Sequence, residues 1–286
     1  MEFTIPARDG FALAATRYRS ADAGAGLVLV SSATAVPRRY YRHFAKALAA
    51  RGFEVLTYDY RGIGGSRPAS LRGFDAKTRD WALLDMAGVV DYGKRSADGR
   101  PLYLVGHSVG GQIAGLLDNG DAIAAMVTVS AQSGYWRMQI GEQKAVVMLH
   151  VYLTLPLLAT VFGYMPWSWF SSAEDLPKGA ALEWSRWCRH PDYLLGDKSL
   201  PLERYAAFEA PVLAYSIADD KWGSRKSVDA MMHGYPSVER RHIEPSAAGV
   251  GPLGHFGFFR PTSAGLWEEI VAWLRDRPPS GRPSMP

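Results

Sequence analysis

Short runs rich in apolar and β-branched residues alternate along this chain with segments whose apolar residues recur at helical spacing. Such runs predict strands buried on both faces, as in a parallel sheet covered by helices. The six candidate strands are Leu27–Ser31, Phe53–Tyr58, Leu102–Gly106, Ala124–Val129, Val212–Ser216 and Val238–Ile243. The pattern therefore predicts an α/β fold, with a mostly parallel central sheet and helices on both of its faces.

Two of the intervening segments have the pattern of a helix that packs one face on such a sheet. We predict helices over residues 38–51, which follow Pro37, and over residues 76–94. The first places Tyr41, Phe44, Ala45 and Leu48 on one face, and the second places Trp81, Leu84, Gly88 and Tyr92.

The first twenty residues predict two short strands joined by a turn at Asp9-Gly10. They contain no basic start followed by an apolar stretch, so we expect no cleaved export signal. Cys188 is the single cysteine, which excludes an intrachain disulfide and favours a reducing compartment. Together these features predict a cytoplasmic protein.

The composition excludes several classes of protein. Of the 286 residues, 48% are hydrophobic, which is enough for one large buried core and excludes a disordered chain. Lys and Arg number 32 and Asp and Glu 28, so the net charge is only +4, and the charges are scattered. A nucleic-acid partner is therefore not expected.

The alternation of strands and helices stops after Val129 and resumes at Val212. We predict a core over 1–130 and 210–276, a helical insertion, or cap, over 131–209, and a flexible tail over 277–286. Five of the nine tryptophans lie in the predicted cap. They either build the core of a small helical subdomain or form the wall of an apolar cleft. For the second case the candidate substrate-binding residues are Trp136, Trp167 and Trp184.

One segment of the cap, Ala145–Phe162, is apolar enough to raise the question of a membrane span. Pro156 interrupts it, and His150, Tyr152, Thr154 and Thr160 dilute it. We therefore predict a helix that is buried or lies at an interface, and no integral membrane span, although a span at the lower end of the required length stays open.

The residues that carry chemistry follow the strand at 102–106. Gly106-His107-Ser108-Val109-Gly110 has the form GxSxG and precedes a predicted helix of small residues over Gln112–Leu117. Such a turn holds a serine exposed on a strained backbone, and the glycines allow close approach of neighbouring chain. The backbone NH of Val109 would face the negative charge that develops on a substrate carbonyl oxygen.

At these residues the chain resembles the α/β-hydrolase superfamily. Residues 59–66, Asp-Tyr-Arg-Gly-Ile-Gly-Gly-Ser, are similar to its DxRGxGxS turn, and the resemblance covers about 5–129 and 210–274. They do not complete a dinucleotide fingerprint, because Arg67 stands where a glycine is needed. More narrowly, the chain resembles bacterial predicted hydrolases of the serine aminopeptidase and monoacylglycerol-lipase-like branch, which implies esterase-type chemistry.

A serine nucleophile needs a base and a carboxylate, and the resemblance implies that they follow in the order acid, then histidine. Asp219 and Asp220 come after the strand at 212–216. We favour Asp220 as the acid and keep Asp219 as the alternative, since either aspartate would also cap a helix beginning near Ser224.

His255 lies in a glycine-rich loop after the last strand, and its place in the order predicts that it is the base of a catalytic triad with Ser108 and Asp220. His107, beside the nucleophile, is expected to be structural and to pack beneath this elbow.

The second oxyanion donor follows the strand at 27–31. Members of the superfamily often carry His-Gly there, whereas this chain has Ser31-Ser32-Ala33-Thr34. By position we assign the backbone NH of Ala33 or of Thr34. No metal-binding motif occurs, so we expect neither a metal nor a cofactor.

These residues predict a serine hydrolase that cleaves an ester-like bond of a small, largely apolar substrate through an acyl-enzyme on Ser108. The same triad would serve a peptidase, thioesterase, acyltransferase or C–C hydrolase, because specificity lies in the cap. A non-catalytic ligand receptor is the less favoured alternative.

Overall fold

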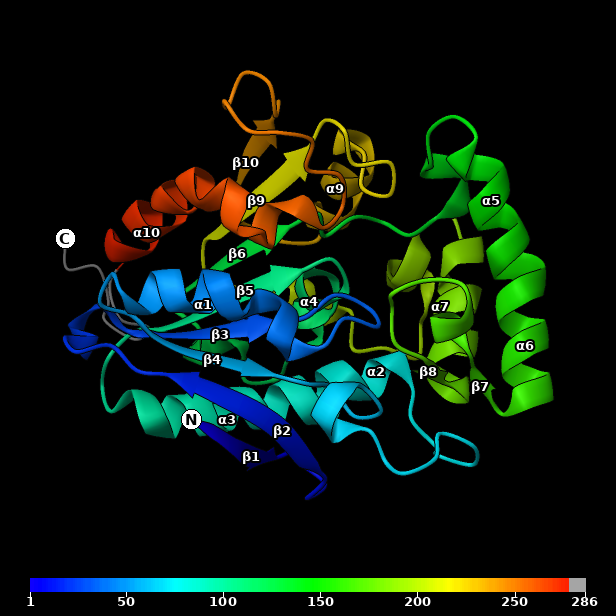
Figure 1. The fold of residues 1–286 in the computed structure, drawn as a ribbon, viewed down its shortest axis with the longest axis horizontal. Coiled ribbons are helices and arrows are strands. Elements are labelled where there is room, and N and C mark those ends of the chain that lie inside the picture. Colours follow the sequence, from blue (N-terminus) through cyan, green and yellow to red (C-terminus); the bar gives the residue numbers. More distant parts are fainter. Residues whose placement is uncertain (278–286) are drawn as a thin grey trace.

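An eight-stranded sheet runs through the residues that the computed structural model describes, 1–277 (Figure 1). Its strands are β1 (Glu2–Pro6), β2 (Ala12–Tyr18), β3 (Leu27–Ser31), β4 (Glu54–Tyr58), β5 (Leu102–His107), β6 (Ala125–Val129), β9 (Val212–Ile217) and β10 (Val238–Ile243). The spatial order is β1-β2-β4-β3-β5-β6-β9-β10. Pairing is antiparallel from β1 to β2 and from β2 to β4, and parallel elsewhere. The mostly parallel sheet is confirmed, with each of the six predicted strands within one residue of an observed one.

Helices cover both faces of the sheet because successive strand residues point to opposite sides. In β3, Leu27 and Leu29 belong to one core cluster, and Val28 and Val30 belong to the other. The first cluster lies against α3 (Ala87–Ala97) and α9 (Arg225–Met232), and the second lies against α1 (Arg42–Ala49) and α10 (Trp267–Arg275).

The predicted helices differ from the observed ones where the helical repeat changes. A 3₁₀ turn over Arg38–Tyr41 precedes α1. The helix expected over 76–94 consists of α2 (Thr78–Asp80), a π turn over Trp81–Met86, and α3. Because a π turn shifts the register of the helix face, Leu84 and Tyr92 are only half-buried, whereas Trp81 and Gly88 are buried as predicted.

The cap, residues 131–209, lies beside the carboxyl ends of the parallel strands (Figure 1). Its elements are α5 (Gln143–Leu149), a π turn (His150–Thr154), α6 (Leu155–Phe162), β7 (Tyr164–Met165), β8 (Leu176–Pro177), α7 (Lys178–Arg189) and α8 (Glu203–Ala206). The antiparallel pair of β7 with β8 was not predicted from the sequence. Residues 278–286, most of the predicted tail, lie outside the described residues.

The helix from α5 through α6, residues 143–162, is by length and composition able to cross a membrane. Only 22% of its most apolar window is buried inside the protein. A stripe at four-residue spacing, Val147, Val151, Leu155 and Ala159, is buried, and the opposite side is exposed. Of the two predicted alternatives, a buried helix does not describe most of this surface, and a helix at an interface stays a prediction, because hydropathy records apolar residues but not which of them find a partner.

Candidate active site

Ser108 occupies a sharp turn between β5 and α4 (Val109–Gln112). Its φ of 50° and ψ of −118° are a conformation that side-chain-bearing residues rarely adopt. A Cβ on Gly106 would lie 2.5 Å from the Gly111 nitrogen, and one on Gly110 would lie 2.4 Å from the Ser31 carbonyl oxygen. The two glycines therefore permit the turn, as the sequence indicates. The helix predicted over Gln112–Leu117 is a 3₁₀ turn over most of its length, Ile113–Leu116, and the α-helical turn α4 precedes it.

Asp220 contacts the imidazole of His255. The ring donates from Nδ1 to Asp220 Oδ2 at 2.8 Å, and Oδ1 accepts from the backbone NH of Trp222 at 2.8 Å. Burial acts to raise the pKa of Asp220, but the nearby His255 and these hydrogen bonds outweigh it, so the pKa is lowered. The carboxylate stays charged and fixes the proton on Nδ1, which leaves Nε2 of a neutral His255 ring available as a base.

Asp219 has a different partner. Its exposed carboxylate accepts hydrogen bonds from the backbone NH groups of Leu253 and Gly254, each at 2.9 Å. It therefore holds the loop that carries His255 and does not touch the ring. The expected helix cap is made by another residue, since Ser224 Oγ accepts from the NH of Ser227 at the start of α9.

His107 joins the three loops of the site through a chain of hydrogen bonds. It is completely buried, and burial lowers its pKa to about 3, so the ring is neutral. Nε2 lies 2.9 Å from the His255 carbonyl oxygen, and Nδ1 lies 2.8 Å from the Tyr41 hydroxyl. A carbonyl only accepts, so Nε2 donates and Nδ1 accepts from Tyr41. The Tyr41 oxygen in turn accepts from the NH of Ala33 at 2.9 Å.

This chain brings the His255 loop next to the Ser108 turn, since the rings of His255 and of His107, the residue before Ser108, have centroids 5.2 Å apart. Within residues 1–277, however, no hydrogen bond joins the Ser108 hydroxyl to the His255 ring. Catalytic hydrogen bonds are often long before substrate binds, so this geometry is compatible with a triad.

The same contacts separate the two candidates for the second oxyanion donor. The NH of Ala33 is used by Tyr41, so Ala33 does not fit this role. Thr34 lines the pocket that contains Ser108, and in the described part of the chain its NH has no hydrogen-bond acceptor. Ala35, with a φ of 60°, turns the loop where a glycine would be unstrained. Val109 begins α4, so its NH has no acceptor within that helix.

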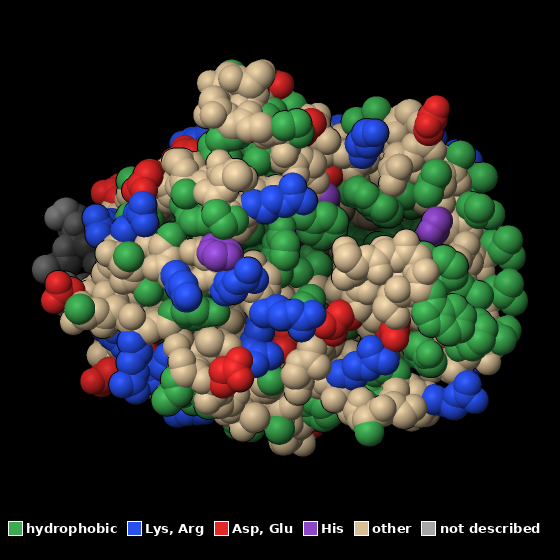
Figure 2. Space-filling view, in the orientation of Figure 1, with side chains coloured by type: hydrophobic (Ala, Val, Ile, Leu, Met, Phe, Trp, Pro, Cys, Tyr) green, Lys and Arg blue, Asp and Glu red, His purple; other side chains and the backbone are tan. Residues whose placement is uncertain are grey.

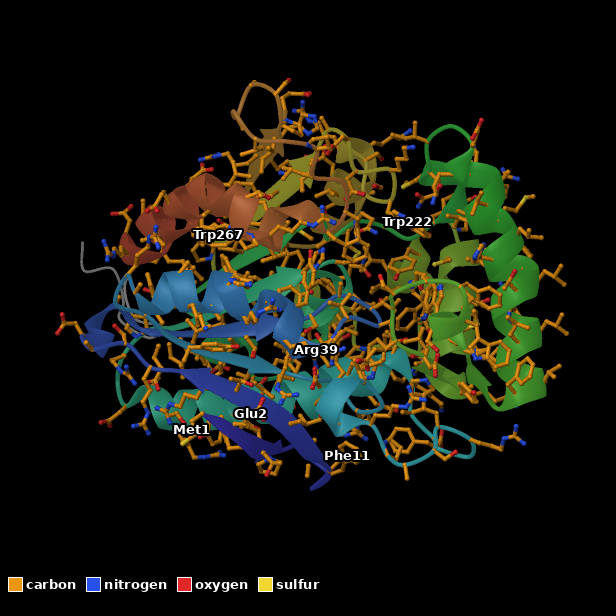
Figure 3. All side chains as sticks on the ribbon, in the orientation of Figure 1. Met1, Glu2, Phe11, Arg39, Trp222 and Trp267 are labelled. Carbon is orange, nitrogen blue, oxygen red and sulfur yellow. The ribbon has the colours of Figure 1, made fainter. Side chains whose placement is uncertain are left out.

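A narrow pocket beside Ser108 separates the core from the cap. Its lining residues are Thr34, Ser108, Gln112, Gln132, Gly134, Gln139, Val147, Trp184, Cys188 and Trp222. Of the three predicted substrate-binding tryptophans, only Trp184 is among them. Trp136 instead packs on Tyr152, with ring centroids 6.2 Å apart, and Trp167 packs behind Trp184 at 5.6 Å. Trp222, missed by sequence analysis, reaches the pocket from the β9 side (Figure 3).

Three glutamines give this pocket a polar part that the sequence did not reveal. Gln112 accepts a hydrogen bond from the Tyr193 hydroxyl at 3.0 Å. Gln132 and Gln139 are 6% and 7% exposed, and their carbonyl oxygens have no hydrogen-bond partner among residues 1–277. Because a buried carbonyl oxygen without a partner is costly, these two side chains favour a ligand that carries hydrogen-bond donors.

The carboxylate of Asp59 lies inside the DxRGxGxS turn to which it belongs. Asp59 accepts hydrogen bonds from the NH groups of Gly65 and Arg38, and a Cβ on Gly64 would lie 2.4 Å from the Asp59 carboxylate. The turn therefore binds its own carboxylate. A wider concavity of about 500 Å³, lined in part by Arg17, Glu54 and Arg100, contains Ser20 and Ser96 but no histidine among its lining residues that would act as their base. Within residues 1–277 no group of three metal-ligating side chains comes together.

The chain has a mostly parallel sheet, a strained serine between strand and helix, and a paired histidine and aspartate on neighbouring loops. These features define it as an α/β-hydrolase. The family model described as serine aminopeptidase, S33, matches residues 22–176, and the chain belongs to this family. Asp220 and His255 lie beyond the matched segment. No curated protein matches the chain significantly.

Solved structures of several hydrolases share the fold at low sequence identity. A soluble variant of monoglyceride lipase from Saccharomyces cerevisiae, in complex with a substrate analogue, is 15% identical with a TM-score of 0.66, covering 95% of this chain and 96% of that one. An esterase from Exiguobacterium antarcticum is 17% identical with a TM-score of 0.64, covering 96% and 100%. Est1E from Butyrivibrio proteoclasticus, with ferulic acid bound, is 16% identical with a TM-score of 0.61, covering 96% of each chain.

Proposed function

We propose that the protein is a serine hydrolase that cleaves ester-like bonds through an acyl-enzyme on Ser108. Membership in the family supports ester hydrolysis in general. The observation that carries the specific proposal is the hydrogen bond from His255 Nδ1 to the buried, charged Asp220, on a loop tied to His107 next to the serine. This arrangement leaves His255 Nε2 free to act as the base.

In the proposed reaction the Ser108 oxygen attacks the ester carbonyl carbon while its proton passes to His255 Nε2. The NH groups of Val109 and Thr34 stabilise the negative oxygen of the tetrahedral intermediate. The C–O bond to the alcohol then breaks, and the alcohol leaves with the proton from His255. Water next attacks the acyl-serine with His255 again as base, which releases the acid and regenerates the Ser108 hydroxyl.

The pocket favours a substrate with both apolar and hydrogen-bonding parts. Val147, Trp184 and Trp222 offer apolar contacts, whereas Gln132 and Gln139 offer amide carbonyl oxygens without partners. We therefore modify the expectation of a largely apolar substrate: the ester carries a hydroxyl or amide group near the scissile bond. The free volume of about 20 Å³ holds little more than one water molecule, so substrate entry requires movement of the cap.

An aminopeptidase is the alternative that the family description names. Such an enzyme needs an acidic residue in its pocket to bind the free α-amino group of a peptide. None of the pocket residues is Asp or Glu. The lining therefore favours a neutral ester over a peptide with a charged amino terminus.

A series of p-nitrophenyl esters of increasing acyl length, assayed with the wild type and Ser108→Ala, tests the proposal. We expect hydrolysis with a chain-length optimum, loss of turnover in Ser108→Ala, and a fluorophosphonate adduct mapped to Ser108. Ser246→Ala, at an exposed serine, is the matched control and should retain activity. Full activity of Ser108→Ala, or a folded wild type without an adduct on Ser108, would overturn the assignment.

A further inference from the structure

Exposed large apolar side chains are concentrated on one side of the cap. Ten of the twelve in the described part of the chain lie between residues 140 and 170: Ile140, Val146, Met148, Leu149, Tyr152, Leu153, Leu157, Val161, Trp169 and Phe170. We call these ten residues the apolar cap face. In Figure 2 apolar side chains cover much of the side where Figure 1 shows α5 and α6. Contiguous apolar surface of this kind marks an interaction site in a soluble domain.

The apolar cap face follows one side of the helix over 143–162. Leu149, Leu153, Leu157 and Val161 recur every four residues and are 52%, 53%, 51% and 62% exposed. Residues 145–162 contain no Asp, Glu, Lys or Arg. The opposite stripe, from Val147 to Ala159, is buried in the cap. A helix with one packed side and one exposed side is suited to lie in the plane of a bilayer surface, whereas a spanning helix would lose the packed side.

Cations without an ion-pair partner surround this face. Residues 137–173 contain three charged side chains, all before the helix or in its first turn. Two are cations, Arg137 and Lys144, and one is an anion, Glu142. The fold adds Arg72, whose Cγ would lie 3.1 Å from a Cβ on Gly163 at the end of α6, and Arg189, whose guanidinium lies 5.5 Å from the Tyr152 ring centroid. No ion pair involving these four cations occurs within residues 1–277. Such a rim is complementary to negatively charged lipid headgroups.

Two aromatic residues extend the face past the end of α6. Trp169 packs on Phe162 with ring centroids 4.9 Å apart, and Phe170 lies beside Trp169. Both are exposed, at 58% and 64%. Tryptophan is favoured at the boundary between lipid headgroups and hydrocarbon, where an amphipathic ring is partly wet.

We propose that the apolar cap face docks on the surface of a bilayer that contains anionic lipids, with the helix over 143–162 lying in the interface. A second copy of the chain fits less well, because a two-fold contact would bring the same unpaired cations against each other. Val147, on the inner side of this helix, lines the pocket of Ser108. With this docking, the helix lies between the bilayer and the site. The inference rests on the proposed function and deepens it, because it names membrane-resident lipid esters as the substrate class.

Flotation with lipid vesicles tests docking without any catalytic readout. The full chain is mixed with vesicles of phosphatidylcholine alone or of phosphatidylcholine with a minority of phosphatidylglycerol. We expect it to float with the anionic vesicles and to be partly released by salt, since surface charges are screened within about 10 Å at 0.1 M. Brominated lipid should quench tryptophan fluorescence in the wild type, and less in Trp169→Phe.

The decisive variant replaces Leu149, Leu153 and Leu157 by glutamine, which keeps helix propensity and removes apolar contact. We expect its vesicle affinity to fall about tenfold or more, with hydrolysis of a soluble short-chain ester unchanged. A double variant, Arg72→Gln with Lys144→Gln, should weaken binding to anionic vesicles only. Its matched control, Arg19→Gln with Lys46→Gln, removes the same charge at exposed positions outside the cap and should bind as the wild type does.

Three outcomes would overturn docking: a wild type that stays unbound with anionic vesicles, a triple glutamine variant that folds by circular dichroism and still binds equally well, or a dimer that the triple variant dissociates. Failure of the proposed function is a separate result. Ser108→Ala should bind vesicles as the wild type does, and if that variant retained esterase activity the nucleophile assignment would fail while the docking result stood.

Discussion

Tyr41 offers the sharpest test of how the site is held together. Its hydroxyl accepts from the NH of Ala33 and donates to His107 Nδ1, and all three groups are buried. Tyr41→Phe removes one oxygen and leaves the ring, which packs on Phe259 at a centroid distance of 4.9 Å. The substitution therefore isolates the hydrogen bonds from the packing.

The expected magnitude follows from the two groups that lose their partner. Each buried donor or acceptor left unsatisfied costs about 1–3 kcal/mol, so Tyr41→Phe, which leaves two, should lower the free energy of unfolding by about 2–6 kcal/mol. The loop with Ala33 also carries the NH of Thr34. Complete loss of an oxyanion donor costs about 10²–10³ in kcat, so a displaced donor should lower kcat by about tenfold with little change in KM.

Urea unfolding followed by tryptophan fluorescence measures the first effect, and steady-state hydrolysis of a soluble ester measures the second. Tyr215→Phe is the matched control, because it removes a hydroxyl bonded to Glu269 at 2.7 Å, in a contact that none of the catalytic loops shares. It should lose about 1 kcal/mol and keep kcat. If Tyr41→Phe changed neither the unfolding free energy nor kcat relative to this control, the hydrogen-bond chain would not position the site.

The remaining predictions concern the acid pair, His107 and the pocket. Asp220→Asn should lower kcat by about 10³–10⁴, because the imidazole loses its charged partner. Asp219→Asn loosens only the loop backbone and should lower kcat by about tenfold. Equal losses of kcat in the two variants would contradict the assignment of Asp220 as the acid. The folded state holds His107 neutral with a pKa of about 3, against about 6.5 when unfolded. The unfolded chain therefore binds the extra proton, and stability should fall by up to about 4–5 kcal/mol as the pH drops from about 6.5 to 3. Urea titrations of His107→Gln at several pH values should give a flatter curve, and an identical curve would refute this origin. Gln139→Leu should raise KM for esters with a hydroxyl near the scissile bond and not for esters without one; a uniform change would rule out a polar contact.

The strands and the serine turn were predictable because each leaves a short, local pattern in the sequence. A strand buried on both faces is apolar at nearly every position, which makes it easy to recognise. The predicted strand Leu27–Ser31 has the same bounds as β3. The turn at Ser108 needs glycine at two fixed places, since a Cβ there would collide with backbone atoms. The glycine spacing can be recognised within five residues, although the atom that Gly110 makes room for belongs to a remote residue, Ser31.

Other parts of the site depend on contacts between remote segments. The sequence could not decide between Ala33 and Thr34, because the decision rests on one hydroxyl of Tyr41. The polar pocket was missed because Gln132 and Gln139 carry no motif and come together only when the cap folds over the core. For the helix over 143–162, hydropathy predicts apolar contact on every side but not that one side is left exposed.

The sheet itself sets the distances between the catalytic loops. The NH of Ser108 donates to the Val129 carbonyl, and the NH of Ser130 donates to the Tyr215 carbonyl, each at 2.9 Å, so ladder bonds continue past the strand ends from β5 through β6 to β9. The end of β9 supplies both Asp219 and Asp220, and the end of β5 supplies His107. The His255 loop is thus fixed by contacts to two strand ends in one rigid sheet. Because these restraints come from two separate residues, Asp219 and His107, loss of one leaves the other to hold the loop that carries the imidazole.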